Sequence, residues 1–143
     1  MIHRTRIKVR FYELDPYDHV NHAAYVQYFE VARIELLDQV GMGISPLLEA
    51  GYQLVVTELH IRYLASAGSG DEVEVETEVA EIRRASSRWR QTMRRGDEVL
   101  AEQEIVVAAT NRQGRPIRLP EGMAAALAPY LADGMGSPGP PYG

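Results

Sequence analysis

The sequence predicts an α+β fold in which five antiparallel strands wrap around one long central helix, with a short helix near the C-terminus. Two observations carry this prediction. Only one long segment, residues 21–40, has apolar residues at helical spacing, whereas one segment before it and four after it alternate apolar and polar residues. A run of strands after a single helix is typical of an antiparallel sheet packed on that helix.

Composition narrows the class of protein. Of the 143 residues, 45% are hydrophobic and 24% charged, which is typical of one globular domain rather than a disordered chain. The net charge of −5 argues against a general nucleic-acid binder. The absence of cysteine excludes disulfides, thiolate metal sites and thiol nucleophiles. No segment has the character of a signal peptide or a membrane span, so we expect a cytoplasmic protein without a membrane partner.

The first strand is expected over Thr5–Tyr12, where Ile7, Val9 and Phe11 alternate with charged residues. Such alternation is typical of a strand with one buried face. A proline and two aspartates then break the pattern in residues 13–18, which indicates a loop.

The long helix is expected to begin after Asn21, a good N-cap, and to end before Gly41, where a glycine stop belongs. At about 1.5 Å per residue it is roughly 30 Å long, enough to span a small domain. Its apolar positions are Tyr25, Val26, Phe29, Ala32, Leu36, Leu37 and Val40.

Four strands are expected after the helix. The apolar residues change parity after Val79, which indicates a bulge or a bend. Gly96-Asp97 predicts a hairpin turn between the last two strands. The four strands are expected over residues 55–63, 73–82, 87–94 and 99–109.

Residues 1–132 are expected to form a single domain that includes an Ala-rich helix over Glu121–Leu131, and the Gly/Pro-rich residues 133–143 are expected to be disordered. A sheet that buries only one face on its own helix leaves its edges and outer face for a partner. We therefore expect a homo-oligomer, either a dimer or a homotetramer.

Polar side chains gather between the first strand and the helix, and three interpretations of them are open. In the first, Asp18 and Asn21 cap the helix and the histidines are exposed loop residues. In the second, Asp15, His19 and His22 bind a metal ion, although their spacing matches no established ligand set. The cluster consists of Asp15, Asp18, His19, Asn21 and His22, with Glu30 two turns into the helix.

In the third interpretation, the helix N-terminus is an active site. The N–H groups of a first helical turn are unpaired and lie at the positive end of the helix dipole, so they can stabilise an oxyanion. Asp15, on the loop ahead, would act as a general base on water or as a nucleophile. A carboxylate is a weak base, so it suits a thioester, whose thiol leaves readily. No G-x-S-x-G elbow, P-loop or G-x-G-x-x-G motif offers a rival site.

One run of sequence is distinctive. It reads RFYELDPYDHVNHAAY from Arg10 to Tyr25 and continues with YFEVAR over residues 28–33. This run resembles the 4-hydroxybenzoyl-CoA thioesterase-like family of acyl-CoA thioesterases, which have the hotdog fold. Ile61-Arg62-Tyr63-Leu64 and Gly70-Asp71-Glu72-Val73 resemble the family's strand-turn-strand segment, and the likeness covers about residues 5–112.

The resemblance implies hydrolysis of an acyl-CoA thioester. Asp15 matches the family's catalytic carboxylate, and His22 matches the residue whose backbone N–H polarises the thioester carbonyl. His19 and Glu30 match the family's histidine and helix glutamate, which would position substrate or water. Asp18 departs from the family, in which a glycine is usual, and it either influences Asp15 electrostatically or caps the helix.

Substrate contacts are expected from two further pairs. Arg83 and Arg84 resemble a basic pair that contacts coenzyme A phosphates in some family members, and Tyr17 and Tyr25 would line the substrate pocket. The strand that precedes Arg83 is rich in acidic residues. The arginines that face outward on the next strand are therefore expected, as an alternative, to form cross-strand ion pairs. These arginines are Arg88, Arg90 and Arg94.

The sequence thus predicts an acyl-CoA thioesterase without a metal and without a cofactor other than the coenzyme A of its substrate. Two alternatives stay open. One is a non-catalytic module that binds acyl-CoA or another small ligand, and the other is a metal-dependent hydrolase. The acyl group is not specified by the sequence.

Overall fold

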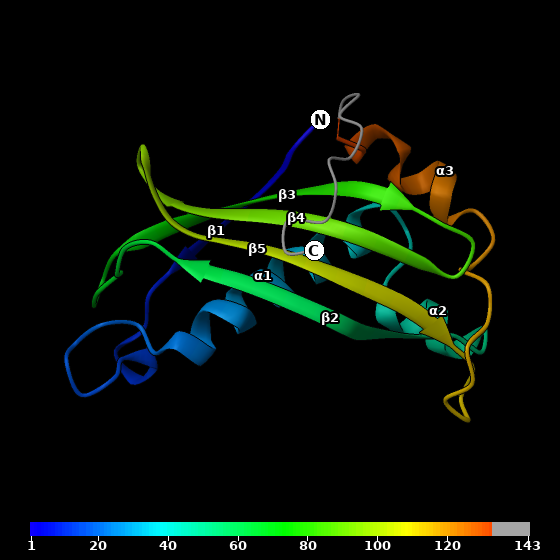
Figure 1. Cartoon of the computed structure of the whole chain (residues 1–143), viewed down its shortest axis with the longest axis horizontal. Helices are drawn as coiled ribbons and strands as arrows, with labels where there is room; N and C mark the ends of the chain where they lie inside the picture. Colours follow the sequence, from blue (N-terminus) through cyan, green and yellow to red (C-terminus); the bar gives the residue numbers. More distant parts are fainter. Residues whose placement is uncertain (133–143) are drawn as a thin grey trace.

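The computed structural model describes residues 1–132 and shows one curved antiparallel sheet with a long helix along one face (Figure 1). The strand order is β1-β3-β4-β5-β2, so the predicted fold class is confirmed. The strands are β1 (His3–Lys8), β2 (Gln53–Tyr63), β3 (Glu72–Ile82), β4 (Ser86–Arg95) and β5 (Glu98–Thr110). The helices are α1 (His22–Gln39), α2 (Ile44–Glu49) and α3 (Met123–Leu127), with 3-10 turns η1 (Phe11–Glu13) and η2 (Ala128–Tyr130).

Helix α1 begins and ends where the sequence predicts. The N-cap is Asn21, and Gly41 has a φ of +81°, a left-handed conformation that glycine adopts without strain. The helix packs mainly against β3 and β1. Strand β2, at the far edge of the sheet, is therefore left largely exposed. The buried apolar residues of α1 are Ala24, Tyr25, Tyr28, Phe29, Ala32, Leu36 and Leu37.

The four later strands follow the predicted alternation. The parity change after Val79 is a bulge between Val79 and Glu81, and Gly96 turns the β4–β5 hairpin with a φ of +59°. A second bulge, between Val56 and Glu58 in β2, has no signal in the alternation. The inner face buries, among others, Val73, Val75, Trp89, Met93 and Ile105.

Opposite charges pair across the outer face of the sheet. Arg94 contacts Glu76 of β3 at 3.0 Å, as expected. Arg88 and Arg90 instead find their shortest partner on β5, where Glu104 lies 3.1 and 3.5 Å away. All three arginines therefore take part in cross-strand ion pairs.

The first strand is shorter than predicted. It ends at Lys8, because the Glu13 carboxylate accepts the N–H of Arg10 at 2.8 Å and closes the turn η1. Phe11 is consequently 79% exposed and not part of the core. The chain thus leaves the sheet four residues early and forms the loop that precedes α1.

The C-terminal helix is also shorter than predicted. It ends at Leu127 and continues as η2, since Pro129 has no N–H with which to extend an α-helix. Helix α2 was not predicted, because six residues are too few to show a helical period. The expected tail, residues 133–143, lies outside the described residues, and the domain boundary at 132 stays a prediction. No helix in the described part of the chain is long and apolar enough to cross a membrane.

Candidate active site

A pocket of about 310 Å³ opens where the loop before α1 meets the first helical turn and the end of β2. This is one end of the elongated sheet, opposite the β3–β4 turn (Figure 1). Three of the predicted catalytic residues come together there. The lining includes Asp15, His19, His22, Tyr25, Tyr63 and Ser66.

The Asp15 carboxylate is held by the loop that carries it. Its Oδ1 accepts the N–H of Tyr17 at 2.8 Å and the N–H of His19 at 3.1 Å. The Asp15 N–H donates in turn to the His19 carbonyl at 2.7 Å. The second oxygen, Oδ2, has no hydrogen-bond partner among residues 1–132. One oxygen thus fixes the side chain and the other is free to act on a substrate or on water.

Glu13 anchors this loop on the helix. Its Oε1 accepts the Tyr28 hydroxyl at 2.5 Å, and its carbonyl accepts the Asn21 N–H at 2.8 Å. Burial and the Glu13 carboxylate together raise the pKa of Tyr28 far above its usual value, so its hydroxyl stays a donor. Sequence reasoning missed this pair, whose partners lie fifteen positions apart in the chain.

The first residue of α1 has an unpaired backbone donor. The Asn21 side chain accepts the Ala23 N–H at 2.9 Å, and the Asn21 carbonyl accepts the Ala24 N–H at 2.8 Å. The His22 N–H has no acceptor in the described chain. An unpaired amide at the positive end of an 18-residue helix can stabilise a developing oxyanion.

Asp18 plays no part in capping the helix. It is exposed and has a φ of +63°, and its N–H donates to the Asp15 carbonyl at 3.1 Å. Asn21 alone supplies the side-chain cap. Asp18 is therefore a turn residue of the loop. Aspartate tolerates this left-handed conformation better than most residues do.

Tyr63 is a pocket residue that sequence reasoning missed. Its hydroxyl donates to the His22 carbonyl at 2.9 Å, and its ring meets the Tyr25 ring edge-on at 5.2 Å. Burial, and then proximity to Tyr25, raise the pKa of Tyr63, so the hydroxyl remains a donor at neutral pH. The alternation of apolar and polar residues in β2 does not single out Tyr63 as a pocket residue, because Tyr63 fits that alternation like any other apolar residue.

The two predicted substrate tyrosines differ in position. Tyr25 lines the pocket but is buried, and its hydroxyl accepts the Ala67 N–H at 3.1 Å. Tyr17 is 78% exposed and outside the lining, and it contributes only its backbone N–H, to Asp15. Their predicted substrate contacts stay predictions.

Glu30 lies outside this pocket. It lines a second, mostly apolar pocket beside α1, together with Ile34, Trp89 and the buried Arg33. The Arg33 guanidinium donates to Gln91 Oε1 at 3.0 Å. Burial lowers the pKa of Arg33 to about 10, which the Glu30 charge opposes. The predicted role of Glu30 therefore requires a substrate, or a second copy of the chain, that reaches this pocket.

Arg83 and Arg84 lie at the other end of the sheet. They follow β3, whose 11 residues at about 3.3 Å each span roughly 35 Å from the pocket end. Both are exposed, and Arg83 contacts Glu81 at 3.1 Å. Within one chain, the structure does not bring these arginines to the pocket of Asp15.

The metal interpretation gains no support from the side-chain geometry. Asp15, His19 and His22 share the pocket, but the described residues contain no group of three or more His, Asp or Glu side chains arranged to hold a metal ion. These three residues therefore lie close together, but their side chains are not arranged as metal ligands.

Comparison with known proteins identifies the family. A model of the thioesterase-like superfamily matches residues 9–127, a stretch that contains the whole pocket. The chain belongs to this superfamily. It is a thioester hydrolase, and its sheet wrapped around one helix is the hotdog fold that the resemblance implied.

Named relatives of this thioesterase include the acyl-CoA thioesterase YbgC of Haemophilus influenzae, 31% identical over 85% of this chain and 90% of that one. The acyl-acyl carrier protein thioesterase ATL3 of Arabidopsis thaliana is 26% identical over 90% of this chain and 69% of that one. The crystal structure of a probable thioesterase from Bartonella henselae is similar with a TM-score of 0.81 and 25% identity, over 84% of this chain and 100% of that one.

Proposed function

We propose that this thioesterase hydrolyses an acyl-CoA thioester, with Asp15 as the reacting carboxylate and the His22 N–H as the oxyanion donor. One observation carries the proposal: the free Oδ2 of Asp15 and the unpaired His22 N–H belong to residues that line the same pocket. The relatedness to an acyl-CoA thioesterase over most of both chains supports the substrate class.

Two routes are compatible with this arrangement. As a general base, Asp15 takes a proton from water while the water oxygen bonds to the thioester carbon. The oxyanion formed beside the His22 N–H then collapses, the C–S bond breaks, and the proton passes to the departing thiolate. As a nucleophile, Asp15 bonds to the carbon itself, the thiolate leaves, and water hydrolyses the resulting anhydride. The products in both cases are a free acid and coenzyme A.

We further propose that two copies associate along β2. Within residues 1–132 this edge strand of 11 residues pairs only with β5, whereas the other edge, β1, has six residues and carries Arg4, Arg6 and Lys8. A long unprotected edge with apolar side chains favours pairing with another strand. Its exposed apolar residues are Val55, Val56, Leu59 and Tyr63.

Association along β2 would also give Arg83 and Arg84 a role. Two identical edge strands related by a two-fold axis pair in opposite directions. The β3–β4 turn of one copy would then lie toward the pocket end of the other. A basic pair supplied by a second copy suits the phosphates of coenzyme A, which the same-chain arginines cannot reach.

A thiol-release assay tests the proposal. Purified protein is supplied with aliphatic, aromatic and branched acyl-CoAs and with an acyl carrier protein thioester, each with and without a chelator. We expect release of coenzyme A from at least one acyl-CoA, without an added cofactor and unaffected by the chelator. We also expect the enzyme to be cytoplasmic. Coenzyme A-dependent thermal stabilisation without thiol release would instead indicate a binding module. Loss of activity with the chelator would indicate a metal-dependent hydrolase.

A further inference from the structure

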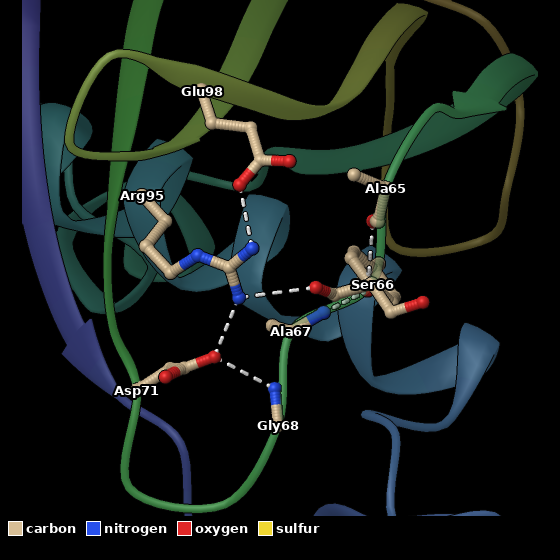
Figure 2. Close-up of polar contacts among 8 residues, drawn as sticks. Ala65, Ser66, Ala67, Gly68, Asp71, Arg95 and Glu98 are labelled. Carbon is tan, nitrogen blue, oxygen red and sulfur yellow. Dashed lines mark hydrogen bonds and ion pairs between the residues drawn. The ribbon is translucent and has the colours of Figure 1, made fainter.

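Arg95 is the centre of a polar cluster beside the pocket (Figure 2). From the end of β4, its Nη1 donates to Asp71 Oδ2 at 2.7 Å and to the Ser66 carbonyl at 3.1 Å. Its Nη2 donates to Glu98 Oε1 at 2.6 Å. One guanidinium thus joins the β4–β5 hairpin to the loop between β2 and β3. Of these four residues, only Ser66 lines the pocket.

The loop that Arg95 holds is a wall of the pocket. Leu64, Ala65 and Ser66 line it, and the loop continues through glycines toward β3. Asp71 Oδ2 also accepts the Gly68 N–H at 2.8 Å, so one carboxylate oxygen connects Arg95 to the loop backbone. Asp71 and Arg95 therefore fix a segment whose glycine content would otherwise leave it flexible.

The same loop runs antiparallel to the segment that enters α1. Val20 N–H donates to the Ala67 carbonyl at 2.8 Å, and His19 and Gly68 are bridge partners. His19 in turn donates its N–H to Asp15 Oδ1, and Val20 directly precedes the N-cap Asn21. The residues that hold the Asp15 carboxylate and those that lead into the N-terminus of α1 therefore pair directly with this loop.

We propose that Arg95, acting through Asp71, is a positioning residue of the thioesterase site. It sets the placement of residues 66–68, which set the placement of residues 19–20, and these fix the Asp15 carboxylate and the helix N-terminus. A planar guanidinium suits this role because its donors address several acceptors in a fixed geometry, which an ammonium group does not. The proposal rests on the proposed function of Asp15 and His22.

Arg94 provides a matched control. It is the preceding residue on β4, points to the outer face, and hydrogen-bonds one carboxylate, that of Glu76. Arg94→Met and Arg95→Met remove the same side chain, but only Arg95→Met releases the loop. Asp71→Ala and Asp71→Asn form a second pair, since asparagine keeps an oxygen for the Gly68 N–H and for Arg95.

The test measures kcat and KM of these variants well below their unfolding temperatures. We expect Arg95→Met and Asp71→Ala to lower kcat about tenfold or more with KM changed less than about twofold, because misplaced catalytic groups slow the chemical step. Arg94→Met should match the wild type, and Asp71→Asn should recover most of the activity lost in Asp71→Ala. If Arg95→Met resembles Arg94→Met in kcat, or Asp71→Asn gives no rescue, the proposal is overturned.

A readout that needs no turnover separates this proposal from the proposed function. In hydrogen–deuterium exchange, the amides of Val20 and Gly68 should exchange faster in Arg95→Met than in Arg94→Met, whatever substrate the enzyme uses. Unchanged exchange would overturn the positioning role. A wild type that hydrolyses none of the thioesters would overturn the proposed function alone. Should Arg95→Met not fold, Arg95→Lys and the Asp71 pair decide the outcome by the same criteria.

Discussion

The hydroxyl of Tyr63 donates a hydrogen bond to the His22 carbonyl at 2.9 Å and thereby joins the end of β2 to the first residue of α1. The two residues are 41 positions apart in the chain, and both line the pocket. The bond fixes the helix N-terminus on which the proposed oxyanion donor stands.

Replacement of Tyr63 by phenylalanine tests this relationship. The ring contact with Tyr25 is kept and only the hydroxyl is lost, so we expect the free energy of unfolding to fall by about 1 kcal/mol or less. If the transition state loses the same free energy of stabilisation, kcat falls roughly fivefold. Tyr12→Phe is the control, because Tyr12 is 69% exposed and its hydroxyl has no partner in the described chain. Equal kcat values for the two variants would contradict the role of Tyr63.

The buried Arg33 allows a prediction about stability. It is 7% exposed, and its pKa is lowered to about 10 mainly by burial, so the charged form is poorly solvated. We expect Arg33→Met to leave the free energy of unfolding unchanged or to raise it by up to about 2 kcal/mol. Gln91→Leu should instead lower it by about 3 kcal/mol, because it removes the acceptor of a buried cation and also the hydrogen bonds that Gln91 Nε2 donates to the Phe29 carbonyl and the Thr77 hydroxyl. Denaturant unfolding measures both, and a larger loss for Arg33→Met than for Gln91→Leu would refute this account.

Asp71 predicts how stability depends on pH. The Gly68 N–H, and then Arg95, lower the pKa of Asp71 below the ordinary 3.8. A carboxylate with a depressed folded-state pKa stabilises the fold above the unfolded-state value and loses this contribution as pH falls through the folded-state value. We therefore expect the stability difference between wild type and Asp71→Asn to be full above about pH 5 and to shrink below about pH 4.

Chemical unfolding across this pH range measures the difference. Asp97→Asn is the control, since Asp97 is an exposed turn residue whose side chain makes no hydrogen bond in the described chain. A difference between wild type and Asp71→Asn that stays constant from pH 3 to pH 7, about the range of carboxyl titration, would show that Asp71 does not act through its charge.

Much of the fold could be predicted because its signals are local. The helical spacing behind Asn21 and the alternation of each later strand need only neighbouring residues. The site was predictable only in part. Asp15 and His22 lie close in the chain, whereas the Tyr63 bond and the position of Glu30 in a second pocket depend on how α1 lies on the sheet. The order of residues in the sequence likewise does not show that Arg83 lies a whole strand length from the pocket.

The proposed association along β2 predicts a change in oligomeric state. Leu59 is 42% exposed and pairs with the buried Ile105, so it lies on the inner face of the sheet. A lysine there places a charge in the proposed interface, and we expect Leu59→Lys to be monomeric in light scattering. Ile2 is the control, because it is 38% exposed and directly precedes β1 at the opposite edge of the sheet, and Ile2→Lys should keep the wild-type size. A Leu59→Lys protein of wild-type size would contradict association along β2.

The most direct test of the catalytic proposal compares Asp15→Asn with Asp18→Asn in the thiol-release assay. Both variants remove one carboxylate from the same loop. Asp15 lies in the pocket with a free Oδ2, whereas Asp18 is an exposed turn residue whose left-handed φ asparagine also tolerates. We predict that Asp15→Asn folds and assembles as the wild type does but loses kcat by about 1,000-fold or more, while Asp18→Asn stays within about twofold of the wild type. Full activity in Asp15→Asn would contradict the account.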